Sequence, residues 1–170
     1  MDWRTLAELE LGETPTVVDY CLKELQVLLE QAEITYPQGD NNRFLLRFLR
    51  VDKFDVSAAF QRIIKYYKLR AKMIPRGCGP CDFKNIYNGQ MLTVLPGLDS
   101  DHRKVLIARV GHWNASSGFT LEDAYVPDIL LLEHILDDDE TQVRGLVFIV
   151  DMGEFSFWHI RQFGFGHHLK

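Results

Sequence analysis

The 170-residue sequence predicts an α/β fold, with a helical N-terminal lobe followed by a lobe built on a sheet. Apolar residues recur at helical spacing through most of residues 14–76, which is typical of amphipathic helices. Two continuous apolar runs, VLIARV at 105–110 and LVFIV at 146–150, have the composition of buried strands. A helical pattern over 121–136 separates these runs, and this order predicts a βαβ unit on a parallel or mixed sheet.

The predicted domain boundaries follow the same pattern. Residues 1–13 form an N-terminal tail, 14–76 the helical lobe, 77–90 a connector with a short helix near 83–89, and 91–170 the sheet lobe. The helical lobe holds three helices. The first is expected to begin at Thr14 with Pro15 and to end near Glu33. The second should begin at Asp40 or Asn41 and end near Val51. The third should begin at Asp55 or Ser57 and be stopped by Pro75 and Gly77.

The second helix carries the most informative stretch, RFLLRFLRVDKFD at 43–55. Arg43, Arg47 and Arg50 fall at i, i+4 and i+7, so they share one helical face, while phenylalanines and leucines gather on another. The third helix repeats this division. Its apolar face is Phe60, Ile63, Ile64 and Tyr67, and its basic face is Arg62, Lys65, Lys68 and Lys72.

Local signals predict the remaining elements of the sheet lobe. The acidic run 137–140 opposes the dipole at a helix C-terminus and should end the 121–136 helix. The strand at 146–150 is expected to be buried. The other signals are an apolar segment at 91–95 bounded by Pro96-Gly97, a turn at 99–101, a capping box of Thr120 with Asp123, a kink or late helix start at Pro127, and a last short helix capped by Ser156 and broken by Gly164 and Gly166.

Composition limits the classes of protein that the chain can represent. With 46% hydrophobic and 25% charged residues it is an ordinary globular sequence. No apolar run approaches the roughly 20 residues that cross a bilayer, and the acidic N-terminus lacks the apolar core of a signal peptide. Three cysteines do not make a disulfide framework. We therefore expect a cytoplasmic protein without a transmembrane segment.

The net charge of −5 conceals three blocks of alternating sign. Residues 1–40 carry a net charge of −7, residues 41–76 carry +8, and residues 77–170 carry −6. A basic segment between acidic ones can meet an anionic surface, such as a phosphoinositide membrane, through Arg62, Lys65 and Lys68. The alternative is that these residues are the solvated faces of amphipathic helices.

Cys78-Gly79-Pro80-Cys81 is the CGPC tetrapeptide of thioredoxin active sites. That chemistry needs a thiol of lowered pKa at a helix N-terminus, directly after a core strand. Here the preceding residues end a helix, and no strand leads into the motif. We therefore favour a turn between the lobes, with a thioredoxin-like redox function as the alternative.

No other motif indicates catalysis, a metal or a cofactor. The run 146–151 ends in Asp like a magnesium-binding strand of nucleotide hydrolases, but the sequence contains no GxxxxGK[ST] loop. The six histidines form no ligand set such as HExxH. The basic segment has no nucleic-acid-binding signature. We expect a protein that is not an enzyme, with no cofactor, no metal and no nucleic-acid partner.

Four segments in collinear order resemble the CRAL-TRIO family of intracellular carriers of lipophilic ligands, and within it the tocopherol-transfer branch. The resemblance extends over roughly residues 14–170. The segments are FLLRFLR and KFD within 43–55, KVLIARVGHW at 104–113, the stretch 133–151 with its ETQ and RG motifs, and FWH at 157–159.

The resemblance implies a carrier that holds one small lipophile, such as a tocopherol, a retinoid or another lipid, between a sheet and covering helices. It also implies peripheral attachment to phosphoinositide membranes, including those of endosomes, with Lys170 matching one of a basic pair. The alternative is a phosphoinositide-binding trafficking module whose cargo is secondary. Position by position, the implied ligand-binding residues are Ala108, Tyr125, Asp128, Ile129, Leu132, Leu146, Phe148, Val150 and Phe155.

These ligand candidates alternate by two on the strands and recur at three and four on the helix, as residues of one face do. Ordinary core residues would show the same spacing. The chain departs from the family at Asp52, where a basic residue is common, which weakens one head-group contact. It also stops at Lys170, where the family's lipid-binding lobe is about half built, so we expect a partial lobe.

Overall fold

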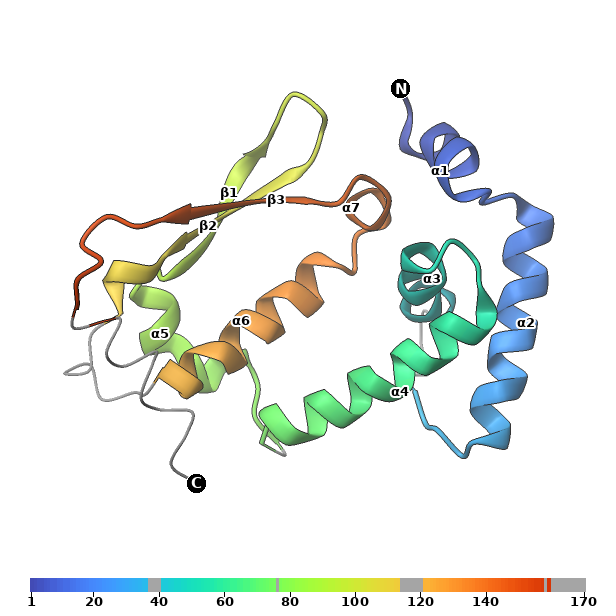
Figure 1. Ribbon diagram of the computed structural model, residues 1–170, viewed down its shortest axis with the longest axis horizontal. Coiled ribbons are helices and arrows are strands. Elements are labelled where there is room, and N and C mark those ends of the chain that lie inside the picture. The colour runs from blue at the N-terminus through green and yellow to red at the C-terminus, as the bar shows by residue number, and fades with distance from the viewer. Residues whose placement is uncertain (37–40, 76, 114–120, 158, 160–170) are drawn as a thin grey trace. The chain divides into compact units, whose positions relative to one another are not determined.

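The computed structural model describes residues 1–36, 41–75, 77–113, 121–157 and 159. The chain forms two compact units (Figure 1). The first unit comprises Met1–Lys72 and His134–Gly145, and the second comprises Met73–Glu133 and Leu146–Lys170. A short segment from the middle of the sheet lobe's sequence therefore packs with the N-terminal helices.

The first unit is built from helices around an aliphatic core. Leu25, Leu29, Leu45, Leu49 and Ile63 are completely buried there, and Phe44 and Phe48 pack edge to face beside them. The helices are α1 (Trp3–Leu11), α2 (Pro15–Gln31), α3 (Asn41–Val51), α4 (Val56–Met73, whose last residue is assigned to the second unit) and α7 (Asp139–Arg144).

The predicted cap residues explain where two of these helices begin. The Thr14 hydroxyl accepts a hydrogen bond from the backbone N–H of Val17 at 3.3 Å, and Pro15 occupies the first helical position of α2. The Asp55 carboxylate accepts the backbone N–H of Ala58 at 2.9 Å, so Asp55 rather than Ser57 caps α4. Helix α3 begins at Asn41, and the other candidate cap, Asp40, lies outside the described residues.

The predicted N-terminal tail instead contains helix α1. The Asp2 carboxylate accepts the backbone N–H of Arg4, and Gly12 ends the helix with a φ of 70°. Ala7 is buried. An N-cap Asp, a run of good helix formers and a terminal Gly are local signals, so this helix could have been predicted from the sequence.

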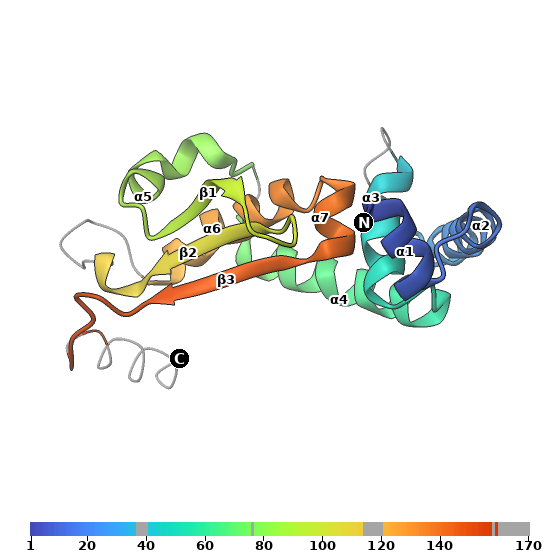
Figure 2. The same cartoon turned by 90° about the horizontal axis from the view of Figure 1, so that it is seen from above.

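The second unit contains a three-stranded mixed sheet in the order β1-β2-β3. Strand β2 (Lys104–Arg109) pairs antiparallel with β1 (Leu92–Leu98) and parallel with β3 (Leu146–Asp151). Helix α6 (Leu121–Ile135) covers one face of this sheet, as Figures 1 and 2 show from two directions. The parallel pairing after an intervening helix confirms the predicted α/β class.

Strand β1 runs farther than predicted. The sequence suggests an end before Pro96-Gly97, but the strand continues to Leu98, with a register shift between Val94 and Leu98. Within the described sheet β1 is an edge strand, where a missing ladder donor and a bulge are tolerated. The following turn forms as predicted, because Asp99 accepts the backbone N–H groups of Asp101 and Arg103.

The acidic run 137–140 has a second role that the sequence reading missed. Helix α6 ends at Ile135, as its charge predicts. Asp138 then caps α7 by accepting the backbone N–H of Thr141 at 3.1 Å, and two acidic residues occupy the first turn of that helix. Negative charge is favourable at a helix N-terminus, so the same residues that end one helix begin the next. Pro127 lies inside α6, which starts before it.

The expectation that residues 146–150 are buried is wrong. Phe148, Ile149 and Val150 expose 55%, 46% and 52% of their surface. Among the described residues β3 has a neighbouring strand on one edge only, so its apolar side chains lack the cover that a central strand receives.

The expected capping residues Thr120 and Asp123 and the helix breakers Gly164 and Gly166 fall outside what the structure describes in detail. In the described part of the chain, no helix combines the length and the apolar character that crossing a bilayer requires.

Candidate functional site

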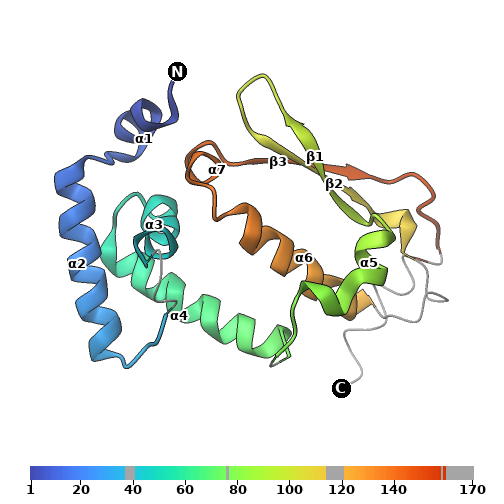
Figure 3. The same ribbon diagram turned by 180° about the vertical axis from the view of Figure 1, so that it is seen from behind.

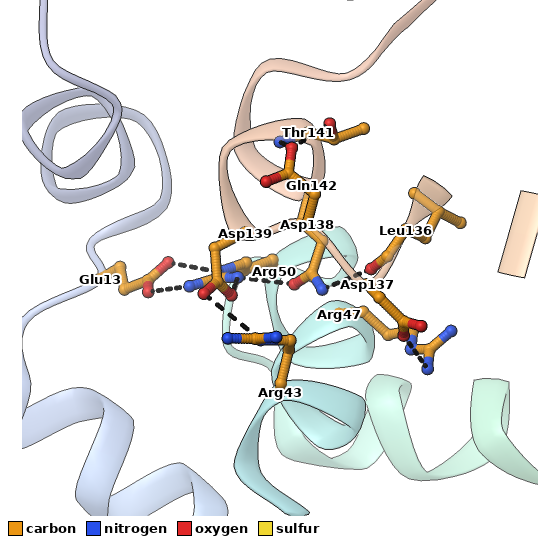
Figure 4. Close-up of polar contacts among 10 residues, drawn as sticks. All are labelled: Glu13, Arg43, Arg47, Arg50, Leu136, Asp137, Asp138, Asp139, Thr141 and Gln142. Atoms are coloured by element: carbon orange, nitrogen blue, oxygen red, sulfur yellow. Dashed lines mark hydrogen bonds and ion pairs between the residues drawn. The ribbon is translucent and has the colours of Figure 1, made fainter. Parts of the chain in front are cut away.

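The arginine face of α3 meets the acidic residues around α7 within the first unit (Figure 4). Arg50 lies at the centre, with its side chain only 3% exposed. Its Nε and Nη2 donate to the two carboxylate oxygens of Glu13 at 2.8 and 2.7 Å, which is a bidentate pair. Its Nη1 donates to Asp139 at 2.8 Å and to the side-chain oxygen of Gln142 at 2.6 Å.

These hydrogen bonds maintain the charge on Arg50. Burial alone would lower its pKa, but the hydrogen bonds that Arg50 donates to Glu13 and Asp139, together with the negative charges of these two carboxylates, more than offset burial and raise the pKa. Gln142 is itself held by donating to the carbonyl of Leu136 at 2.7 Å. Two motifs that lie 92 residues apart in the sequence, the FLLRFLR and ETQ motifs, therefore contact each other through Arg50 and Gln142.

The other two arginines of α3 also face carboxylates. Arg47 lies over the ring of Phe44 at 4.5 Å and pairs with Asp137 at 3.4 Å. Arg43 pairs with Asp139 at 3.6 Å. The cationic face of α3 is thus engaged inside the protein by partners that the spacing of the arginines could not identify.

The basic face of α4 is exposed. Lys65, Lys68 and Lys72 lie on it, with the exposed Leu69 among them. Arg62 belongs to the same face, but its guanidinium forms a bidentate pair with Asp52 at 2.6 and 2.7 Å. Asp52, where the family that the sequence resembles commonly has a basic residue, thus pairs with Arg62, one of the predicted membrane contacts. Lys170 lies outside the described residues.

The predicted ligand residues on the strands share one face of the sheet. In the parallel register Ala108 is opposite Val150, and Leu106 is opposite Phe148, while Leu146 lies two residues before Phe148. Opposite residues point the same way and alternation has a period of two, so these side chains form one apolar surface. Their role in binding a ligand stays a prediction.

The predicted ligand residues on α6 also share one face. Tyr125, Asp128, Ile129 and Leu132 are spaced by three and four residues, and the last three are half-buried. Asp128 differs from the others in charge. Burial raises the pKa of its carboxyl group to about 6, and among the described residues it has no hydrogen-bond or ion-pair partner.

Tyr87, which the sequence reading did not single out, lies beside this position. It belongs to α5 (Lys84–Asn88), and Figure 3 shows α5 next to α6. The Tyr87 hydroxyl donates to the carbonyl oxygen of Pro127 at 3.1 Å. Burial, and then the negative charge of Asp128, raise the pKa of Tyr87. The Tyr87 phenol and the Asp128 carboxylate are therefore close enough to interact electrostatically.

Phe155 lies in a small aromatic cluster rather than on either of these faces. Its ring stacks on His159 at 5.3 Å between centroids, and the His159 Nε2 lies 3.0 Å from the carbonyl oxygen of Trp113. A Cβ at Gly111 would collide with the backbone of Gly153, so only glycine permits this close approach. The HW and FWH motifs thus contact each other, which gives Phe155 a packing role as well as its predicted ligand role.

The CGPC motif adopts a turn that leads into a short 3₁₀ helix at Pro80–Phe83. Gly79 is the N-cap, and its backbone N–H donates to the Asp82 carboxylate at 2.8 Å. Cys78 is half-buried, Cys81 is exposed, and both are free thiols. Among the described residues before the motif, Met73 ends α4 and residues 74, 75 and 77 belong to no helix or strand, so no described strand leads into it. Among the described residues no group of three or more His, Cys, Asp or Glu side chains could hold a metal ion.

An open groove of about 380 Å³ lies between α1 and the start of α2. It is lined by apolar, hydroxyl and charged side chains, including Trp3, Glu8, Glu13 and Val18. None of the predicted ligand residues lines this groove.

Comparison with known proteins identifies related sequences. Residues 88–168 match the CRAL/TRIO domain family. Alpha-tocopherol transfer protein-like from Mus musculus is 32% identical over 168 residues, which cover 96% of this chain and 48% of the relative. The protein of the same name from Homo sapiens is 30% identical over the same shares. Clavesin-2 from Rattus norvegicus is 30% identical over 157 residues, covering 89% of this chain and 47% of that protein. The chain spans about half the length of the curated relatives it matches.

Proposed function

Because residues 88–168 match the CRAL/TRIO domain family, we propose that the protein binds and carries a small lipophilic ligand. The observation that carries this proposal is the apolar surface of the second unit. Ala108, Phe148 and Val150 share one sheet face, and Ile129 and Leu132 share one helix face. Apolar surface with few polar groups is what a lipophile requires.

The nature of the ligand is proposed from the relatives. Two of them are named for similarity to a tocopherol transfer protein. We infer for this chain a ligand of that type, a tocopherol-like, retinoid-like or other lipid molecule of similar size. Carriage without chemical change is part of the same proposal.

The test is transfer of a fluorescent lipophile from donor vesicles to the purified chain. Leu132→Asp places a charge on the α6 face and should weaken binding at least tenfold, because an ionised carboxylate beside an apolar ligand loses hydration without gaining a partner. Val27→Asp on α2 is the matched control, since Val27 is 48% exposed and belongs to the first unit. No transfer to the unaltered chain, or equal loss in both variants, would contradict the proposal.

A second proposal concerns membranes, and the exposed basic face of α4 favours it. Lys65, Lys68 and Lys72 present three positive charges around the exposed Leu69. Cationic side chains flanking an apolar one suit the surface of an anionic bilayer. We propose that this face attaches the protein peripherally to phosphoinositide-containing membranes, including endosomal ones, where a carrier would collect or deliver its cargo. Vesicle sedimentation with and without phosphoinositide tests it.

A further inference from the structure

Among the described residues, no contact gives the Asp128 carboxylate a structural role. It lies in the interior of α6, so it caps neither end of the helix, and Asp is a poor helix former at such a position. Pro127 before it is completely buried. Among the described residues no side chain or backbone N–H donates to the Asp128 carboxylate. A half-buried carboxylate of this kind is normally paired, because partial removal from water is unfavourable for the charged form.

Asp128 is a polar group on an otherwise largely apolar face of α6. Ile129 and Leu132 lie on the same side of the helix, and Tyr125 lies one turn before it. Tyr87, held by its hydrogen bond to the Pro127 carbonyl, brings a phenol to the same place. Among the described residues Tyr87 is the titratable group whose ionisation Asp128 opposes, and burial is the cause of the raised pKa of Asp128 itself.

We propose that Asp128 is the polar anchor of the ligand site, and that its carboxylate accepts a hydrogen bond from a lipophile whose head group is a hydroxyl or a protonated amine. This inference rests on the proposed carrier function and adds the chemical class of the cargo. The ligand would supply the donor that the described residues do not, while Ile129 and Leu132 contact its apolar part.

The charge of Asp128 makes the anchor selective. Above its pKa of about 6 the group is an acceptor only. An ether or ester head group offers no donor and would leave the carboxylate unpaired. A fatty acid would add a second negative charge beside it. A site built to hydrogen-bond a ligand group rejects analogues that lack the group, so alcohols and amines should be preferred over ethers and acids.

The experiment uses one fluorescent polyene chain ending in an alcohol, a primary amine, a methyl ether or a carboxylic acid. Fluorescence titration of the full chain at pH 7.5 should give at least tenfold tighter binding of the alcohol and the amine than of the ether and the acid. Asp128→Asn should remove most of the amine preference and tolerate the acid. At pH 5 Asp128 is protonated, while the protonation of Tyr87 does not change. The unaltered protein should therefore lose most of its preference for the amine at this pH.

Asp19→Asn is the control, because it makes the same chemical change on the exposed surface of α2. It should leave the order of the four ligands unchanged. Equal binding of the alcohol and its methyl ether, or an unchanged order in Asp128→Asn, would overturn the anchor and leave the carrier proposal standing. Failure of all four ligands to bind would remove both.

Discussion

At the scale of single residues, Arg50 and Asp128 show opposite solutions to the burial of a charge. Arg50 is buried with two carboxylates and a side-chain amide that satisfy its guanidinium. Asp128 is half-buried with no partner among the described residues. A paired charge holds a structure together, whereas an unpaired one reduces stability and leaves capacity for a ligand. The two residues therefore give predictions of opposite sign.

Replacing Arg50 by Ala should be strongly destabilising. The carboxylates of Glu13 and Asp139 would lose their partner in a site with little access to water, which typically costs about 3–5 kcal/mol. Arg4→Ala is the control, since Arg4 is 72% exposed and its pair with Asp2 is 4.0 Å long, which predicts a loss of about 1 kcal/mol or less. Urea unfolding of both variants measures the difference. Similar losses in the two would show that the cluster of Figure 4 does not stabilise the first unit.

Replacing Asp128 by Asn should be stabilising at neutral pH. The folded-state pKa of about 6 lies above the ordinary value near 4, so folding is opposed when the carboxyl group must be ionised. The carboxyl's favourable contribution is present below pH 4 and is lost as the pH rises through 6. Discounted for partial exposure, Asn should add roughly 1–3 kcal/mol at pH 7.5 and little at pH 4. Thermal unfolding of both proteins across this range checks the sign.

At the scale of elements, helices α3 and α4 have the same amphipathic design but different surroundings. The arginines of α3 are paired with the acidic residues around α7 and with Glu13, and Arg47 and Arg50 are largely covered, whereas Arg43 stays 45% exposed. The lysines of α4 are exposed. The +8 segment of the sequence therefore presents a smaller basic surface than its charge suggests, and that surface lies on α4.

Vesicle binding should respond to α4 and to Asp52 in opposite directions. Each lysine near an anionic surface contributes on the order of 1 kcal/mol, so Lys65→Glu with Lys68→Glu should weaken binding about 30-fold or more at low salt. Asp52→Asn removes the partner of Arg62 and should strengthen binding by up to about fivefold. Lys23→Glu on α2 is the control for net charge. Binding that ignores the lysine pair, or that does not weaken with salt, would contradict an electrostatic attachment.

The elements that the sequence predicted are those whose signals are local. Thr14 with Pro15, the cap at Asp55 and the apolar runs of β2 and β3 act on their own neighbours, and the structure confirms each. The sequence pattern does not reveal α7, because an acidic run both opposes the end of one helix and favours the start of the next. The extension of β1 through Pro96 depends on its place at the edge of the sheet, which is a tertiary property.

For the candidate site, the resemblance supplied the residues and their role in binding stays a prediction. The structure places those on the strands on one sheet face and those on α6 on one helix face, a grouping that follows from backbone geometry. The sequence pattern could not show that Gln142 contacts Arg50 or that Tyr87 lies beside Asp128, since these contacts join distant parts of the chain. The burial of β3 was mispredicted for the same reason, because exposure depends on the neighbouring strands.

At the scale of the whole molecule, the described sheet ends in an apolar edge. Phe148, Ile149 and Val150 are about half exposed on consecutive positions, and the outer backbone groups of β3 have no strand beside them among the described residues. An edge strand with exposed apolar residues pairs readily with another chain. We therefore expect the 170-residue chain to bind hydrophobic dye strongly and to associate as its concentration rises.

Ile149→Lys separates association from ligand binding. Successive side chains of a strand point to opposite faces, so Ile149 lies opposite the face that holds Phe148 and Val150. A lysine on an edge strand opposes pairing, and the variant should shift the chain toward the monomer and lower its dye binding while retaining the lipophile. Val27→Lys, at similar exposure on α2, should change neither. Size-exclusion chromatography with light scattering, with lipid analysis of the eluted protein, provides the measurement. If the unaltered chain stays monomeric at all concentrations and carries one lipid, the apolar edge is already covered. The expectation that β3 drives association would then be wrong.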